Sequence, residues 1–293
     1  MKLKVLKTII NKFNKKFGIF SIKKVLNNKF LNLFGIQPLR LIIAKLFYYI
    51  RLIFFKSKID KKNEQLIFLK KNGYLILENF LNEKDFDDLN NFFTLEMKKM
   101  QIDNYKNRFS LSMFKSGECS FKNSLYPQFF KQSFFKNIFE SYFCKNIENS
   151  VSSIHMEKIV KTGKKNELED DPQQYFHRDT FYGGLKGIYF LGDVTSNHGT
   201  LEYLPKSNKI DLKKIKLEYM NSISSNSSQN LRDVTSILRT KSYYEKSIQF
   251  LCKKNTLVIF DVSGFHRRLK AKNRYERNTI RIGFRIHPFS LII

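Results

Sequence analysis

The chain has 293 residues, with 53 Lys and Arg against 26 Asp and Glu, which gives a formal net charge of +27. This length is enough for one large domain, or for one domain with an appendage, and enough to bury a sizeable core. Three cysteines that lie far apart argue against a secreted disulfide framework and favour a reducing cytoplasm. The charge will attract anionic surfaces. However, the abundance of Lys, Asn, Ile and Phe is typical of an AT-rich genome, which explains the Lys excess without a nucleic-acid role.

Residues 1–57 are predicted to form a basic N-terminal helical segment. The first 58 residues hold 14 Lys and Arg and no Asp or Glu. Apolar residues recur at helical spacing within Leu6–Phe17, and Leu39–Phe55 is a second, more apolar stretch. Three cations interrupt the second stretch, and a cation at the bilayer centre costs roughly 2.5–3.5 kcal/mol, which argues against a transmembrane span. Two interpretations remain: contact with an anionic membrane surface, at the inner face of the membrane, or packing on the rest of the protein or on a partner protein.

Residues 58–293 are predicted to form the second unit, which begins with helices. Gly73 ends a short helix, and the segment Tyr74–Phe80 is strand-like. Asn82 is placed to cap the next helix, because its side chain can accept from the free N–H groups of the first turn. The apolar residues of Phe86–Met100 recur every three or four positions and predict one buried face for this helix.

From about residue 150 the pattern changes to short β-rich segments bounded by turn residues. They are SSIHMEKIV (152–160), LKGIYFLGDV (185–194), GTLEYLP (199–205), NTLVIFDV (255–262) and NTIRIGFRI (278–286). Such strands, without long alternating helices, favour an antiparallel sandwich or barrel over a doubly wound α/β sheet. Residues 206–247 are polar and partly helical, and are interpreted as an insertion or lid. The fold class is therefore mainly β with flanking helices.

His177 and Asp179 stand one residue apart in DPQQYFHRDTFYGG (171–184). In an extended segment residues i and i+2 point to the same side, so the imidazole and the carboxylate would project toward a common point. An H-x-D pair alone is weak evidence, because an Asp beside a His often only fixes the imidazole tautomer. A metal site therefore needs a third ligand from another strand. Arg178 points the other way and is interpreted as structural.

His266 is the best third ligand among the other four histidines. It follows a buried apolar strand and a Ser-Gly pair, which places it at the mouth of that strand. His198 lies in a Gly-containing turn, His287 lies near the C-terminus, and His155 is better explained as a core or cleft residue. Two His and one carboxylate with open positions opposite form the metal site of non-haem Fe(II) oxygenases.

Enzymes of this type that use 2-oxoglutarate also need a cation for its distal carboxylate, and the planar fork of Arg suits that role. Arg277 opens the strand after the loop that follows the third ligand, and is predicted to bind this carboxylate. Arg281 lies four residues further along the same strand, so its side chain points to the same face, and it is the alternative residue for binding this carboxylate. The alternative is that both are surface charges of a very basic chain. Phe181 and Tyr182 are expected to line the substrate mouth.

Four segments in order resemble the phytanoyl-CoA dioxygenase family of Fe(II)/2-oxoglutarate oxygenases. They are NGYLILENFL (72–81), FHRD (176–179), HGTLEYLPKSNK (198–209) and NTLVIFDVSGFHRR (255–268). Arg277 follows eleven residues after His266, as in the family pattern. The resemblance covers roughly Leu66 to the C-terminus. The chain departs from the pattern at Lys206 and Asn208, where Gly and His are usual, but neither position is an iron ligand in the family.

This resemblance implies a double-stranded β-helix, or jelly roll, with Fe(II) at one mouth of the barrel. It also implies that 2-oxoglutarate and O2 are consumed, and that succinate and CO2 are released as an unactivated C–H bond is oxidised. Halogenating relatives lack the carboxylate ligand, so Asp179 favours hydroxylation. The expected substrate is a small molecule, a lipid or a cell-envelope glycan intermediate.

Two alternatives remain open. A non-catalytic module on the same fold would hold an anionic polymer on its basic surface, and its binding would survive the change His177→Ala. An oxygenase acting on nucleic acid is permitted by the charge. However, nucleic-acid dealkylating relatives carry an Arg-x-Asn-x-Thr-x-Arg signature whose spacing RNTIR (277–281) does not keep.

Overall fold

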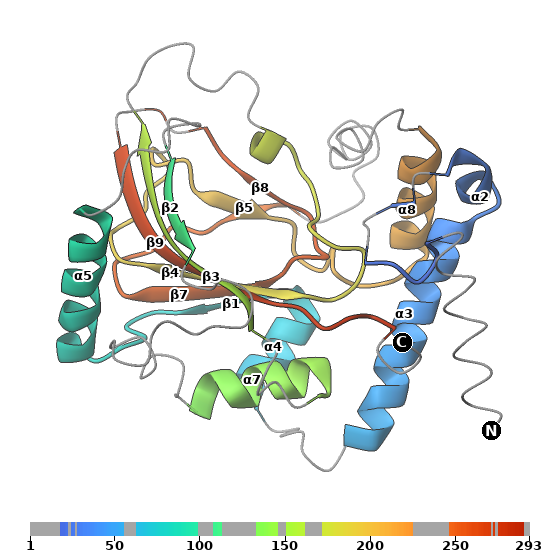
Figure 1. The fold of residues 1–293 in the computed structure, drawn as a ribbon, viewed down its shortest axis with the longest axis horizontal. Coiled ribbons are helices and arrows are strands. Elements are labelled where there is room, and N and C mark those ends of the chain that lie inside the picture. Colours follow the sequence, from blue (N-terminus) through green and yellow to red (C-terminus); the bar gives the residue numbers. More distant parts are fainter. Residues whose placement is uncertain are drawn as a thin grey trace.

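The protein is described by a computed structural model in which two antiparallel sheets are flanked by helices (Figure 1). The structure describes residues 18–22, 25–26, 28–55, 63–98, 108–112, 133–145, 151–161, 172–224, 246–270, 272 and 275–289. The helix predicted within Leu6–Phe17 lies outside these residues. The mainly β architecture predicted for the rest of the chain is confirmed.

The larger sheet has six strands, and every neighbouring pair in it is antiparallel. In spatial order its strands are β1 (Tyr74–Leu77), β7 (Thr256–Asp261), β4 (Leu185–Phe190), β9 (Tyr275–Phe284), β3 (Val151–Lys161) and β2 (Arg108–Ser112). The smaller sheet has the order β6 (Ile248–Gln249), β5 (Leu201–Tyr203) and β8 (His266–Arg268). Each of the five predicted β segments overlaps one of these strands, in chain order β3, β4, β5, β7 and β9.

Alternation along the central strands divides their side chains between two hydrophobic clusters. On β7, Leu257 and Ile259 join the cluster between the large sheet and the helices, whereas Val258 and Phe260 join a cluster on the opposite face of the sheet. Because strand side chains alternate with a period of two, one face of the large sheet packs on helices and the other faces the smaller sheet. The residues on this second face determine what surrounds the candidate site.

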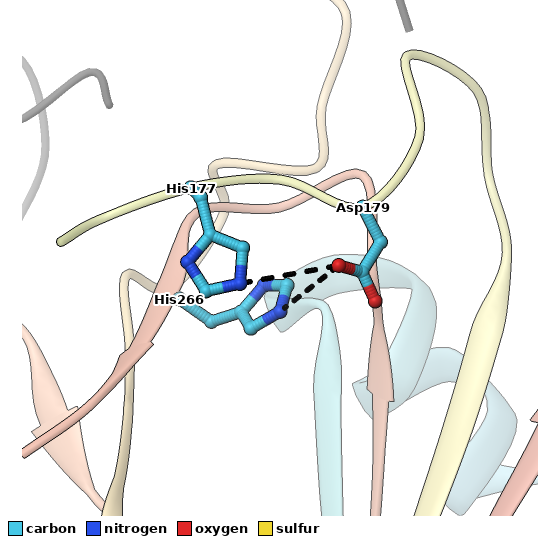
Figure 2. Close-up of side chains that lie close together, drawn as sticks. All are labelled: His177, Asp179 and His266. Carbon is cyan, nitrogen blue, oxygen red and sulfur yellow. Dashed lines mark ion pairs between the residues drawn. The ribbon is translucent and has the colours of Figure 1, made fainter. Parts of the chain in front are cut away.

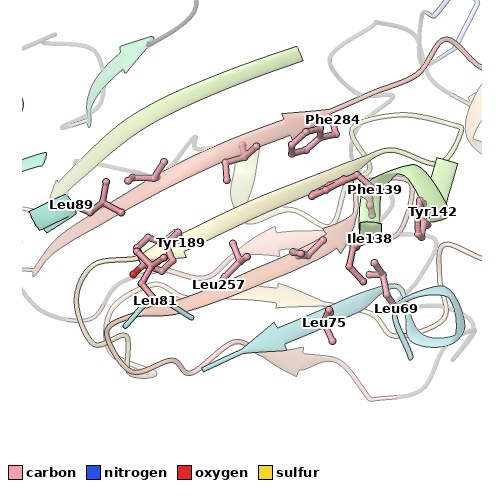
Figure 3. Packing of buried hydrophobic residues seen from close by; sticks show 14 of the residues in the cluster. Leu69, Leu75, Leu81, Leu89, Ile138, Phe139, Tyr142, Tyr189, Leu257 and Phe284 are labelled. Atoms are coloured by element: carbon pink, nitrogen blue, oxygen red, sulfur yellow. The ribbon is translucent and has the colours of Figure 1, made fainter. Parts of the chain in front are cut away.

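Three helices cover the outer face of the large sheet: α4 (Glu64–Asn72), α5 (Glu83–Lys98) and α7 (Ser133–Phe143). Figure 3 shows the cluster they form with the strands, in which the ring of Phe139 on α7 stacks on that of Phe284 on β9 at a centroid distance of 3.7 Å. Both rings are almost fully buried. Truncating such a buried Phe to Ala typically costs about 3–5 kcal/mol, so this cluster holds the helical layer on the sheet.

Local sequence signals place the ends of α4 and α5. Asn63 caps α4 by accepting from the amide of Leu66, and Gly73 ends that helix with a φ of +85°. A Cβ at Gly73 would lie 2.3 Å from the hydroxyl oxygen of Tyr203, so only glycine fits this turn. Asn82 accepts from the amide of Asp85 at 2.9 Å, which confirms its predicted role as the cap of α5.

The N-terminal segment contributes α2 (Lys29–Leu33) and α3 (Ile36–Phe55), which lie against α8 (Leu212–Ser224) at one side of the sheets (Figure 1). The guanidinium of Arg40 is buried and donates to the carbonyl of Ile19 at 2.7 Å and to the side chain of Gln37 at 2.8 Å. These contacts, together with the packing of Leu41 and Ala44, fix one face of α3 on the rest of the protein.

The opposite face of α3 is apolar and open to solvent. It carries large side chains at intervals of three or four residues, namely Leu39, Ile42, Leu46, Tyr49 and Ile53, which are 46–71% exposed. Helical spacing places them in one stripe along the helix. Within the described part of the chain, no helix has the length and apolar character needed to cross a bilayer. The stripe is therefore a surface feature of a helix whose other side is packed.

Candidate metal centre

His177 and His266 lie side by side because their backbones pair across the mouth of the barrel. The amide of each donates to the carbonyl of the other at 2.9 Å, which forms an antiparallel bridge between the start of β8 and the segment that follows the short 3-10 helix Pro172–Gln174. Residues paired in this way project their side chains to the same face. The two imidazole rings are 4.5 Å apart between centroids, and both are buried.

Backbone carbonyls orient both imidazoles. The Nδ1 atom of His177 is 2.8 Å from the carbonyl oxygen of Tyr175, and that of His266 is 3.0 Å from the carbonyl oxygen of Gly264. A carbonyl can only accept, so the hydrogen-bond network assigns the ring proton to Nδ1 in each case. The lone pair of each Nε2 atom is then directed into the site, as a metal ligand requires.

Asp179 completes a group of three side chains that could hold a metal ion (Figure 2). Its Oδ1 atom lies 3.9 Å from Nε2 of His177 and 4.0 Å from Nε2 of His266. The three donor atoms lie within 4.8 Å of one another. The amide of Asp179 donates to the carbonyl of Val262 at 2.8 Å. This bond attaches the ligand loop, the segment that carries His177 and Asp179, to the end of β7.

Burial keeps the imidazole of His266 uncharged. Burial, followed by the neighbouring His177, lowers the pKa of His266 to about 3, so its ring is uncharged near pH 7. Only a deprotonated Nε2 atom can bind a metal. Two imidazoles and one carboxylate are the ligands of a non-haem Fe(II) site with open positions opposite, so the residues present fit that ion.

Two cations that were not predicted hold the other oxygen of Asp179. The ammonium of Lys186 on β4 lies 2.6 Å from Oδ2, and the guanidinium of Arg285 lies 3.7 Å from it. These contacts leave Oδ1 directed toward the histidines. The sequence did contain a signal for Lys186, because its parity on β4 places it on the same face as Ile188 and Phe190, inside the barrel.

Arg277 and Arg281 both lie on the inner face of β9, but they have different surroundings. Arg281 lines a cavity of about 240 Å³ together with Asp179 and Lys186, and its guanidinium is 3.5 Å from a carboxylate oxygen of Glu157. Burial lowers the pKa of Arg281, and the charge of Asp179 partly opposes that effect. Arg277 does not line this cavity, and donates instead to the carbonyl of Gly199 at 3.0 Å.

The aromatic residues after the H-x-D pair lie on the side of the N-terminal helices. Phe181 is buried against Phe289, and the guanidinium of Arg40 lies 4.3 Å from its ring centre. Tyr182 lines a second cavity, described below, that lies outside the barrel. Neither residue lines the small cavity beside Asp179.

Arg178 points away from the metal site, as predicted, and is buried. Its guanidinium binds both carboxylate oxygens of Glu218 on α8, and Lys214 lies 3.8 Å from the same carboxylate. Burial alone would raise the pKa of Glu218, but Arg178 and Lys214 outweigh it and hold the pKa below its ordinary value. This ion pair fixes the ligand loop to α8.

Comparison with known proteins agrees with this geometry. The model of the family described as phytanoyl-CoA dioxygenase matches residues 69–267. No curated protein sequence matches the chain. The solved structure of the epimerase SnoN from nogalamycin biosynthesis, in complex with Fe3+, alpha ketoglutarate and nogalamycin RO, is similar with a TM-score of 0.51 at 9% identity, over 78% of this chain and 87% of that one.

A second similar structure is that of SnoK, a non-heme alpha ketoglutarate dependent carbocyclase from the same biosynthesis. Its TM-score is 0.48 at 12% identity, over 77% of this chain and 84% of that one. At these identities the likeness to SnoN shows the fold, which is the double-stranded β-helix that the order of the strands already indicated. The match of the family model over most of the chain places this protein in the phytanoyl-CoA dioxygenase family, whose members are iron- and 2-oxoglutarate-dependent oxygenases.

Proposed function

We propose that this protein is an Fe(II)/2-oxoglutarate-dependent dioxygenase in which His177, Asp179 and His266 bind the iron. One observation carries the proposal: two buried Nε2 atoms and one carboxylate oxygen, from two distant segments, lie within 4.8 Å of one another. Both Nδ1 atoms are held by backbone carbonyls, which directs each Nε2 lone pair toward the point where a cation would bind. Membership of the family supplies the identity of the cation.

The reaction we propose is hydroxylation of a small-molecule, lipid or cell-envelope glycan substrate. When bound, iron and 2-oxoglutarate supply O2 activation, with release of succinate and CO2. The chain supplies orientation: carbonyls hold the imidazoles in one tautomer, and Lys186 holds Asp179. The carboxylate ligand supports hydroxylation rather than halogenation, because it leaves no vacant site for a halide. Phe181 and Tyr182 remain candidates for the substrate mouth.

For 2-oxoglutarate we propose Arg277 as the residue that binds the distal carboxylate, with Arg281 as the alternative. The position of Arg277 relative to His266 supports the first choice, because it keeps the family spacing. The proximity of Arg281 to Asp179 supports the second, because a bound co-substrate must reach both the iron and its cation. The division of the chain at residue 57, and the role of residues 206–247 as an insertion or lid, also remain predictions.

The experiment that tests the proposal is anaerobic titration of the purified protein with Fe(II) and then 2-oxoglutarate. We expect one Fe(II) per chain and a visible absorption band when the co-substrate is added, followed by succinate release on exposure to O2 with extracts that contain envelope lipids. His177→Ala is expected to lose all three signals. His198→Ala is the matched control, because its side chain lies in a surface turn. Failure of the unaltered protein to bind metal would refute the proposal and favour the non-catalytic binding module.

A location at the inner face of the membrane is also proposed, with the apolar stripe of α3 in contact with an anionic surface. The stripe of exposed side chains supports it, as do the 14 cations and no acids of the first 58 residues. We expect binding to phosphatidylglycerol vesicles, weaker binding to phosphatidylcholine vesicles, and loss of binding in the double variant Leu46→Glu, Ile53→Glu. Leu251→Glu, which changes an exposed apolar residue outside α3, is the control. Equal binding to both vesicles by all variants would contradict this location.

A further inference from the structure

A cavity of about 460 Å³ lies outside the barrel, between α3, α4 and α7 and the loops that carry the metal ligands. Figure 1 shows α4 and α7 below the large sheet and α3 to one side of it. The volume is within the range of about 300–1,000 Å³ that is usual for small-molecule sites. Five lining residues come from α3, which precedes the part of the chain that matches the family model. The cavity is therefore a feature of this chain in addition to its family site.

This cavity is separated from the metal side of the barrel by the end of β7. Asp261 and Ser263 line it, whereas the intervening Val262 lines the smaller cavity that contains Asp179. Alternation along the chain accounts for this division, because successive residues face opposite sides. A molecule in the outer cavity would not touch the iron, but it would contact the segments that hold the iron ligands.

Cations without carboxylate partners line the outer cavity. The ammonium groups of Lys45 and Lys70 and the guanidinium of Arg51 each donate to a backbone carbonyl, at 2.7, 3.0 and 3.4 Å respectively. Among the residues that the structure describes, none of the three forms an ion pair with an acid. Lys209 adds a fourth positive charge to the wall.

Partial burial makes two of these charges, those of Lys70 and Arg51, costly in free energy. Burial lowers the pKa of Lys70 and of Arg51, and no carboxylate offsets the effect in either case. The Nε atom of Arg51, which is a donor, is buried without a hydrogen-bond partner in the described part of the chain. Because partial desolvation of a cation costs free energy that an opposite charge can offset, this wall is suited to an anionic group that the described residues do not provide.

The two carboxylates in the cavity wall are already engaged. Asp261 accepts from the hydroxyl groups of Tyr142 and Ser263, and burial raises its pKa. Asp211 accepts from the amide of Lys214 at the start of α8. Both carboxylates therefore already accept hydrogen bonds within the protein. The side chains of the wall that are left to bind a ligand are mainly positively charged.

The remainder of the wall is aromatic and aliphatic, with Tyr48, Tyr49, Phe143, Tyr182 and Ile286 among its residues. We propose that this cavity is an accessory binding site for a small anionic amphiphile. One phosphate or carboxylate group would lie against Lys45, Arg51 and Lys70, and its apolar body would pack on the tyrosine side chains. Cationic side chains bind such groups through charge-assisted hydrogen bonds, and the apolar contacts would select against inorganic ions.

The test uses octyl phosphate as the probe, below its critical micelle concentration, in isothermal titration calorimetry with the full chain. We expect octyl phosphate to bind at one site, with inorganic phosphate and 1-octanol each binding at least about tenfold more weakly, because each lacks one half of the recognition. Arg51→Met with Lys70→Met is expected to weaken the binding of octyl phosphate about tenfold or more. Lys71→Met is the matched control, because Lys71 neighbours Lys70 on α4 but is exposed and does not line the cavity.

Equal affinity of the double variant and the unaltered protein would overturn the proposal, and so would the absence of binding at millimolar octyl phosphate. Tight binding of inorganic phosphate alone would also overturn it, since the apolar wall would then play no part. If the double variant does not fold, Lys70→Met alone carries the same test. Fe(II) and 2-oxoglutarate binding, measured on the same preparations, is expected to be unchanged in these variants, which separates this site from the metal centre.

Discussion

At the scale of single residues, the candidate site is determined by contacts that the ligands make outside it. Each imidazole is held by a backbone carbonyl two residues earlier in the chain, at 2.8 and 3.0 Å. The carboxylate of Asp179 depends instead on a side chain, the ammonium of Lys186 at 2.6 Å. The histidines are therefore fixed by local backbone geometry, whereas the aspartate depends on a residue that a single substitution can remove.

Replacing Lys186 by Met is expected to weaken Fe(II) binding. Removing the ammonium lowers the repulsion of the incoming cation, but it also frees Asp179 to rotate. Loss of an outer hydrogen-bond partner typically costs about 10–100-fold in metal affinity, so we expect the second effect to dominate. Anaerobic Fe(II) titration measures it, and Lys186→Arg is expected to retain most of the affinity. An unchanged or increased affinity in Lys186→Met would show that the contact does not position the aspartate.

The two arginines of β9 can be ranked by their effect on 2-oxoglutarate. We expect Arg277→Met to raise the dissociation constant for 2-oxoglutarate about 10–100-fold, because a charge-assisted pair contributes about 1.5–3 kcal/mol. Arg281→Met is expected to have a smaller effect. Anaerobic titration of the Fe(II)-loaded protein measures both. The reverse ranking would assign the distal carboxylate to Arg281, the residue that shares a cavity with Asp179.

At the scale of elements, α8 supports the loop that carries two of the ligands. The buried pair between Arg178 and Glu218 joins that loop to a helix within the predicted insertion 206–247. Arg178 was predicted to be structural because it points away from its neighbours His177 and Asp179. Its partner could not be predicted in the same way, because Glu218 lies forty residues further along the chain. The same helix packs on α2 and α3, so the N-terminal segment reaches the ligand loop through α8.

Glu218→Gln is expected to destabilise the fold by about 3–5 kcal/mol, because it leaves the guanidinium of Arg178 buried and without its counter-charge. Urea denaturation followed by circular dichroism measures the change in the free energy of unfolding. Glu276→Gln is the control: this residue also forms an ion pair, with Lys158, but it is 47% exposed, so at most about 1 kcal/mol is expected. A similar small loss in both variants would mean that the buried pair does not stabilise the loop.

At the scale of the whole molecule, metal binding should stabilise the folded chain, because the ligands come from segments that only folding brings together. With free metal at 100 times its dissociation constant, the expected gain is about 2.7 kcal/mol. Thermal denaturation under anaerobic conditions, with and without Fe(II), measures the rise in Tm. Addition of a chelator should reverse it, and His266→Ala should abolish it. A rise of equal size in His266→Ala would place the bound metal elsewhere on the protein.

Much of the architecture could be predicted because its signals are local. Short β-rich segments bounded by turn residues placed β4, β7 and β9, and the pattern of Leu39–Phe55 predicted the long helix α3. The sequence left open whether that helix contacts a membrane or packs on the protein. The structure shows that one face is packed and the other is exposed, because the two faces of an amphipathic helix can serve different partners.

The sequence by itself determined the chemistry of the candidate ligands: an H-x-D pair, a distant His at the end of an apolar strand, and an Arg eleven residues later. Only the tertiary structure decided that His177 pairs with His266 and that Lys186 holds Asp179. It also decided that α3 lines a cavity whose cations have no acidic partner among the described residues. The physical reason is register. Side-chain chemistry and periodicity can be recognised within short segments of the sequence. Contacts across a sheet depend instead on the alignment of distant strands, where a slip of one residue would turn every side chain of a strand to the other face.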